Sequence, residues 1–131
     1  MWFKVLTFLL AVPALAKGLV GLVAPVPFYA WRQTHYSAPR IPGLVLIAPG
    51  LLVAVTVAAW YATLFHYVPW GWIITGLSTG TMLLAAVNLW HWPTHRARAL
   101  RVVADPALCR RVDLTIITGS AGLLLFALLV Y

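Results

Sequence analysis

Residues 44–92 read LVLIAPGLLVAVTVAAWYATLFH, then YVPWG, then WIITGLSTGTMLLAAVNLWHW, and this stretch decides the fold. The hydrocarbon core of a bilayer is about 30 Å thick, and roughly 20 apolar residues cross it as a helix. Both long runs reach that length without a lysine, arginine, aspartate or glutamate. The link between them contains Pro69 and Gly71, which favour a tight turn. We therefore expect residues 44–66 and 72–92 to form two antiparallel transmembrane helices that lie side by side.

Two further apolar runs, at about residues 5–24 and 112–131, have a similar length. Residues 1–16 also resemble a secretory signal, because Lys4 precedes an apolar stretch that ends in Ala14-Leu15-Ala16. We expect this segment to be retained as the first helix. The sequence therefore predicts an all-α integral membrane protein, in which residues 1–131 form a single domain, a bundle of four transmembrane helices.

The composition supports a membrane protein and argues against a soluble one. The chain of 131 residues is 63% hydrophobic and 8% charged, whereas a soluble domain carries about 25% charged residues. The net charge of +7 does not indicate a nucleic-acid partner, because the charges lie between apolar runs and form no basic face. The single cysteine, Cys109, excludes an internal disulfide and a Cys-x-x-Cys motif.

The basic residues predict the orientation in the membrane. Seven of the nine lie in the two long connections, and Lys4 lies on the opposite side. These seven are Arg32, Arg40, Arg96, Arg98, Arg101, Arg110 and Arg111. Loops rich in lysine and arginine stay in the cytoplasm. We therefore expect both termini and the turn at residues 67–71 on the non-cytoplasmic side of a plasma membrane, the bacterial inner membrane.

The connection between the third and fourth helices has an amphipathic segment at residues 93–103. His95, Arg96, Arg98 and Arg101 lie along one side of it, and apolar residues lie along another. This pattern predicts a short helix in the membrane interface. We expect Arg96, Arg98 and Arg101, together with Arg110 and Arg111, to contact anionic lipid headgroups or an acidic cytoplasmic partner.

Four polar residues are predicted to lie within the membrane, toward its cytoplasmic half. Lys17 lies inside the first span, where an ionisable group is costly and is a functional candidate by default. Asp113, at the start of the fourth span, is its natural partner if the two helices touch; in the alternative, Lys17 extends its side chain to the headgroups. Asn88 and His91 form a polar strip on the third span, which suits either a buried contact or a substrate path.

The histidines are candidate ligands of a metal or pigment, although no cofactor is identified. His91 and His95 are four residues apart, a spacing that pairs two ligands on a helix. Pro93 between them disfavours a continuous helix, and a zinc site needs further ligands. Ala62-Thr63-Leu64-Phe65-His66 resembles the Ala-x-x-x-His pattern with which light-harvesting polypeptides ligate the magnesium of bacteriochlorophyll. That resemblance implies a pigment ligand at His66.

Small residues in the third and fourth spans predict close helix packing. Gly76 and Gly80 form a Gly-x-x-x-Gly pattern, and Gly119 and Gly122 lie in the fourth span. Such residues let helix backbones approach closely in lipid. The contact that they form is either internal or with another chain.

The leading functional hypothesis is a noncatalytic accessory subunit of a larger membrane assembly, which contacts lipid or a lipophilic cofactor. The sequence has no phosphate-binding loop and no nucleophile with a base beside it, so we do not expect an enzyme. One alternative is a small homo-oligomeric transporter or channel that uses Lys17, Asn88, His91 and Asp113 as its polar path. Another is a redox protein that interacts with quinone or pigment, similar in general plan to DoxX-like membrane proteins.

Overall fold

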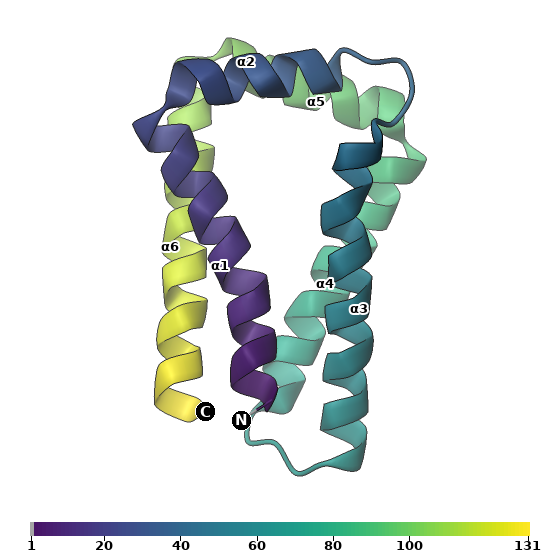
Figure 1. Ribbon diagram of the computed structural model, residues 1–131, viewed down its shortest axis with the longest axis vertical. Coiled ribbons are helices and arrows are strands. Elements are labelled where there is room, and N and C mark those ends of the chain that lie inside the picture. Colours follow the sequence, from purple (N-terminus) through teal and green to yellow (C-terminus); the bar gives the residue numbers. More distant parts are fainter. Residues whose placement is uncertain (1) are drawn as a thin grey trace.

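The computed structural model describes residues 2–131, and this part of the chain is almost entirely helical (Figure 1). Its helices are α1 (Trp2–Val23), α2 (Pro25–Tyr36), α3 (Gly43–Phe65), α4 (Gly71–Trp90), α5 (Trp92–Ala104) and α6 (Pro106–Val130). Four of them, α1, α3, α4 and α6, are long and apolar enough to cross a membrane. The predicted all-α fold with four candidate membrane-spanning helices is therefore confirmed.

The four long helices form two pairs. Figure 1 shows α1 beside α6 and α3 beside α4, with the pairs closest near the chain termini and diverging toward the other end. The helices α2 and α5 lie across that other end and connect the two pairs. Both termini and the α3–α4 turn lie together at the opposite end from α2 and α5.

The α1–α6 pair packs through small side chains. The buried residues of α1 are Phe3, Thr7, Ala11, Gly18 and Gly21, which recur every three to seven positions along one face. A Cβ atom at Gly18 would lie 2.7 Å from the side-chain atom Cγ1 of Ile117 and 3.2 Å from the carbonyl oxygen of Asp113, so α1 and α6 approach closely at this glycine. Close approach of this kind is what holds helices together in lipid, where burial of apolar surface gives no driving force.

The α3–α4 pair is joined by hydroxyl groups. The Thr63 and Thr75 hydroxyls lie 2.7 Å apart and share a hydrogen bond. The indole N–H of Trp60 donates to the Thr79 hydroxyl at 3.0 Å. Hydrogen bonds between helices replace water as the partner of polar side chains inside a membrane.

Threonine hydroxyls that face outward are paired within their own helices. Thr81 donates to the carbonyl of Leu77 at 2.8 Å, and Thr118 donates to that of Leu114 at the same distance. The side chains of both threonines are exposed on the surface of the chain. Each hydroxyl therefore has a partner without water or another helix.

The two helix pairs meet in one apolar cluster near the termini. Its buried members are Phe3 of α1, Ala59 of α3 and Ile74 of α4, and Phe126 and Tyr131 pack against them. The rings of Phe3 and Tyr131 are in edge contact, with centroids 5.5 Å apart. This cluster explains why the pairs are closest at the terminal end.

The connections contain more helix than the sequence analysis expected. A loop was expected after the first span, but Pro25–Tyr36 forms α2, whose first position is a proline that fits the start of a helix. The last helix begins at Pro106 and not near residue 112. The carboxylate of Asp105 accepts hydrogen bonds from the backbone N–H groups of Ala107 and Leu108, and so caps this earlier start.

The α2 and α5 helices pack against each other through aromatic and polar contacts. The rings of Tyr36 and Trp92 stack with centroids 5.6 Å apart. The indole of Trp92 and the guanidinium of Arg96 both donate to the carbonyl of Ala38, at 3.3 and 3.0 Å. These contacts tie the two crossing helices into one layer at the basic end of the molecule.

Candidate functional site: a cleft around Asp113

Asp113 is the most unusual residue of the structure, because its side chain is buried inside an apolar bundle. It lies about two turns into α6 and is 1% exposed. Its carboxylate packs directly against the backbone of Gly21 on α1. A Cβ atom at Gly21 would lie 2.7 Å from the carboxyl carbon and 2.8 Å from Oδ1, closer than real Cβ contacts. Only glycine leaves room for the carboxylate at that position.

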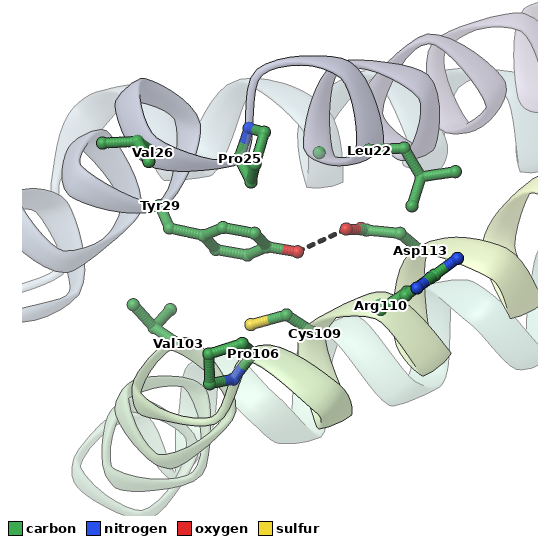
Figure 2. A pocket seen from close by; sticks show the side chains of 10 residues that line it. Leu22, Pro25, Val26, Tyr29, Val103, Pro106, Cys109, Arg110 and Asp113 are labelled. Carbon is green, nitrogen blue, oxygen red and sulfur yellow. Dashed lines mark hydrogen bonds between the residues drawn. The ribbon is translucent and has the colours of Figure 1, made fainter.

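Tyr29 of α2 is the hydrogen-bond partner of this carboxylate. The chain turns sharply between Val23 and Pro25, where α1 ends and α2 begins. This elbow places the phenol of Tyr29 over α6, where its hydroxyl donates to Oδ2 of Asp113 (Figure 2). Burial, and secondly this hydrogen bond, raise the pKa of the Tyr29 hydroxyl, so it remains a donor at neutral pH.

The second carboxylate oxygen has no partner among residues 2–131. Oδ1 of Asp113 is buried and accepts no hydrogen bond. A buried polar atom without a partner typically costs about 1–3 kcal/mol, and a charged one costs more. A binding site is one common reason for such an atom in a native protein.

Lys17, the partner that the sequence suggested for Asp113, lies on the same helix pair. Its own side chain is exposed on the surface of α1. The hydrogen bond to Asp113 comes instead from Tyr29. Whether Lys17 reaches the headgroups stays a prediction.

A cleft of about 670 Å³ opens beside the Tyr29–Asp113 hydrogen bond. Figure 2 shows α1 and α2 on one side of it, α5 and α6 on the other, and the hydrogen bond crossing between them. Most of the lining is apolar: Leu22, Pro25, Val26, Val103 and Pro106. Arg110 lines the cleft as well and is exposed.

Cys109 also faces the cleft, but its thiol is occupied. It is 3% exposed, and its Sγ donates to the carbonyl of Val102 at 2.7 Å. This bond joins the start of α6 to the end of α5.

The structure does not place the four polar candidates on one helix pair. Lys17 and Asp113 belong to the α1–α6 pair, whereas Asn88 lies on α4, which packs with α3. His91 is exposed at the junction between α4 and α5. A polar path through all four residues stays a prediction.

Within residues 2–131, no group of three or more His, Cys, Asp or Glu side chains can hold a metal ion. His95 packs against the rings of Tyr36 and Trp92, with centroids 5.8 Å apart in both cases. Burial and then the charge of Arg32 lower the pKa of His95. The imidazole is therefore neutral at neutral pH and is part of the α2–α5 layer.

His66 lies at the far end of the molecule from His91 and His95, beside a second cleft. This cleft, of about 1080 Å³, lies between the two helix pairs near the termini. Its wall is mainly apolar and includes the aromatic residues Trp2, Phe3, Tyr61, Tyr67 and Tyr131. The side chain of His66 is exposed there. A pigment ligand at His66 stays a prediction.

The arginines predicted to contact lipid or a partner lie at one end. Arg98, Arg101, Arg110 and Arg111 are exposed. Arg96 is half-buried, because it donates to the carbonyl of Ala38. Its guanidinium is therefore partly used in holding α5 to the segment after α2.

The four glycines predicted to mediate packing face outward. Gly76 and Gly80 of α4, and Gly119 and Gly122 of α6, are exposed, and a Cβ atom at each would meet nothing within 4 Å. These glycines therefore make no close internal contact within residues 2–131, and the alternative contact with another chain stays a prediction. Within residues 2–131 the buried glycines are Gly71, at the α3–α4 turn, and Gly18 and Gly21 of α1. The sequence analysis did not single out Gly18 or Gly21.

Tyr29 and Gly21 are the site residues that the sequence analysis missed. Gly18 and Gly21 are small residues in an apolar span, and small residues are enriched where membrane helices approach closely. Tyr29 had no signal, because its role depends on the elbow between α1 and α2. No known protein family, curated protein or solved structure matches the chain.

The Tyr29–Asp113 hydrogen bond predicts a cost for removing the phenol hydroxyl. We expect Tyr29→Phe to lower the free energy of unfolding by roughly 1–3 kcal/mol, because the buried carboxylate loses its donor. Thermal unfolding of the purified chain in detergent measures this. Tyr67→Phe is the control, since Tyr67 is 95% exposed. Equal stability of the two variants would contradict the assigned bond.

The packing of Asp113 on Gly21 predicts a steric penalty for a methyl group. We expect Gly21→Ala to lower the free energy of unfolding by roughly 1–3 kcal/mol. Gly50→Ala is the matched control, because a Cβ atom there meets nothing within 4 Å. The penalty of Gly21→Ala should shrink when Asp113→Ala is already present, since the two groups compete for one space. An unchanged penalty would place the clash elsewhere.

Proposed function

We propose that this chain is a noncatalytic subunit of a larger membrane assembly, which it joins through the outward-facing glycines of α4 and α6. The observation that carries the proposal is the open space over Gly76, Gly80, Gly119 and Gly122. A glycine inside a helix costs up to about 1 kcal/mol relative to alanine. A contact with another helix offsets that cost, whereas lipid alone does not.

The arrangement of the helix pairs supports this proposal. The α1–α6 and α3–α4 pairs pack closely within themselves, but they meet mainly at the cluster near the termini. Their outer faces are lined with apolar side chains and have glycine stripes where another backbone can approach. Small residues on a lipid-facing surface are the usual contact points between transmembrane helices.

The proposed location is a plasma membrane, with the basic end in the cytoplasm. The exposed arginines Arg98, Arg101, Arg110 and Arg111 lie at that end, together with α2 and α5. Positively charged connections are retained on the cytoplasmic side. In this orientation α5 lies in the membrane interface, and the exposed arginines contact anionic lipid headgroups.

Enlarging the α4 glycines tests the subunit proposal. We expect the double variant Gly76→Ile and Gly80→Ile to fold normally, because both positions are open within the chain. We also expect it to lose partner chains that co-purify with the wild type in mild detergent. Crosslinking in membranes followed by mass spectrometry measures the loss.

The matched control is Gly50→Ile, which makes the same change at an open position of α3 outside any glycine stripe. Equal retention of partners by both variants would contradict the proposed interface. Partners that are further copies of this chain, combined with ion or solute flux in liposomes, would favour the transporter or channel alternative.

Cysteine labelling tests the proposed orientation. In a Cys109→Ser background, we expect a membrane-impermeant thiol reagent to label Tyr67→Cys in intact cells. The same reagent should label Arg98→Cys only after the membrane has been permeabilised. The reverse pattern would overturn the orientation, and labelling of both positions in intact cells would contradict a membrane-spanning bundle.

A further inference from the structure

We infer that the cleft around Asp113 binds a phospholipid that carries a free hydroxyl group near its phosphate. The hydroxyl donates to the carboxylate of Asp113, and the phosphate pairs with Arg110. This inference needs only that the chain lies in a membrane. It does not depend on the proposed assembly, so the two can fail separately.

The hydrogen-bond acceptor in this site is the carboxylate of Asp113, of which only one oxygen accepts a hydrogen bond from the protein. Asp113 is 1% exposed and lines the cleft. Tyr29 occupies one carboxylate oxygen, and the other has no donor among residues 2–131. A ligand that donates one hydrogen bond therefore completes the site, because Tyr29 needs only one of the two oxygens.

The charges around the cleft favour a neutral donor over a cation. Asp113 is one of two acidic residues in a chain whose net charge is +7. Arg110 lines the same cleft, and Arg111 is exposed next to it. An ammonium group entering here meets the field of these arginines. A hydroxyl group donates to the carboxylate without that repulsion.

Arg110 supplies the second contact. It precedes Asp113 by three residues on α6, so the two side chains are neighbours on one side of the helix. A guanidinium group binds phosphate through two parallel hydrogen bonds. Asp113 as the acceptor for a hydroxyl and Arg110 as the partner of a phosphate lie close together. This arrangement fits a lipid in which the hydroxyl and the phosphate are a few bonds apart.

The remaining wall and the position of the cleft fit a lipid. Leu22, Pro25, Val26, Val103 and Pro106 offer an apolar surface for a hydrocarbon chain. The cleft lies at the elbows where α1 and α6 meet α2 and α5 (Figure 2). This is the level at which the spans end, so a headgroup can reach Arg110 while its chains remain in the bilayer.

Two matched pairs of lipids test the inference on the wild-type chain in detergent, with native mass spectrometry as the measurement of binding. The first pair is phosphatidylglycerol and phosphatidylpropanol, which differ only in the headgroup hydroxyls. The second pair is lysophosphatidic acid and its 2-deoxy analogue, single-chain lipids with the same ester and phosphate that differ only in the backbone hydroxyl. We expect the hydroxylated member of at least one pair to bind roughly tenfold more tightly.

The preferred pair identifies whether the hydroxyl belongs to the headgroup or to the backbone of the lipid. Equal affinities within both pairs would overturn the inference. Because this comparison uses only the wild-type chain, it stands even if a variant of Asp113 does not fold.

Variants then locate the two contacts. Arg110→Gln should weaken both members of the preferred pair equally, and Arg111→Gln, one residue away and outside the cleft lining, should weaken them far less. Asp113→Ala should abolish the preference for the hydroxylated lipid, whereas Tyr29→Phe should retain it. Equal effects of the two arginine variants, or a preference that survives Asp113→Ala, would contradict the site.

Discussion

A carboxylate that is cut off from water constrains the basic half of this molecule. In lipid no solvent is present to satisfy Asp113, so the protein must surround it with its own groups. Gly21 allows α1 to press against the carboxylate, and Tyr29 provides a donor from α2. One side chain of α6 therefore fixes the separation of α1 and α6 and the direction in which the chain leaves α1. The cleft, the elbow and the position of α2 all depend on it.

The two helix pairs are held by different means. The α1–α6 pair relies on small residues that bring the backbones together, whereas the α3–α4 pair relies on hydroxyl groups such as those of Thr63 and Thr75. Between the long helices of the two pairs, the contact is an apolar cluster near the termini, and at the other end the α2–α5 layer connects the pairs. The contacts within each pair are therefore more extensive than the contacts between the two pairs. Such an arrangement exposes apolar faces on which another membrane protein can pack.

The sequence predicted the spans well because the bilayer imposes their length. The runs at residues 44–66 and 72–92 differ from α3 and α4 by no more than two residues at either end. The start of α6 was predicted near residue 112, whereas the helix begins at Pro106. A hydropathy pattern does not show that the side chain of Asp105 caps the helix at this earlier position. The α2 helix was missed for a related reason: it is only 12 residues long and mixes aromatic with polar side chains, and its contacts with α5 come from residues distant in the sequence. The burial of Asp113 was anticipated only as a pairing with Lys17, since nothing local indicates that Tyr29 will lie above it.

The hydroxyl groups of α4 change what this helix presents to its surroundings. This helix has a mean hydropathy of 1.4, the lowest of the four long helices, partly because it contains Thr75, Ser78, Thr79 and Thr81. Each of these hydroxyls donates to a backbone carbonyl or shares a hydrogen bond with another hydroxyl. A side chain whose only donor is already engaged presents mainly its carbon atoms to lipid. The exposed Thr81 therefore presents a mainly apolar surface, whereas Thr75 and Ser78 are buried, so α4 is less polar on its outside than its sequence suggests.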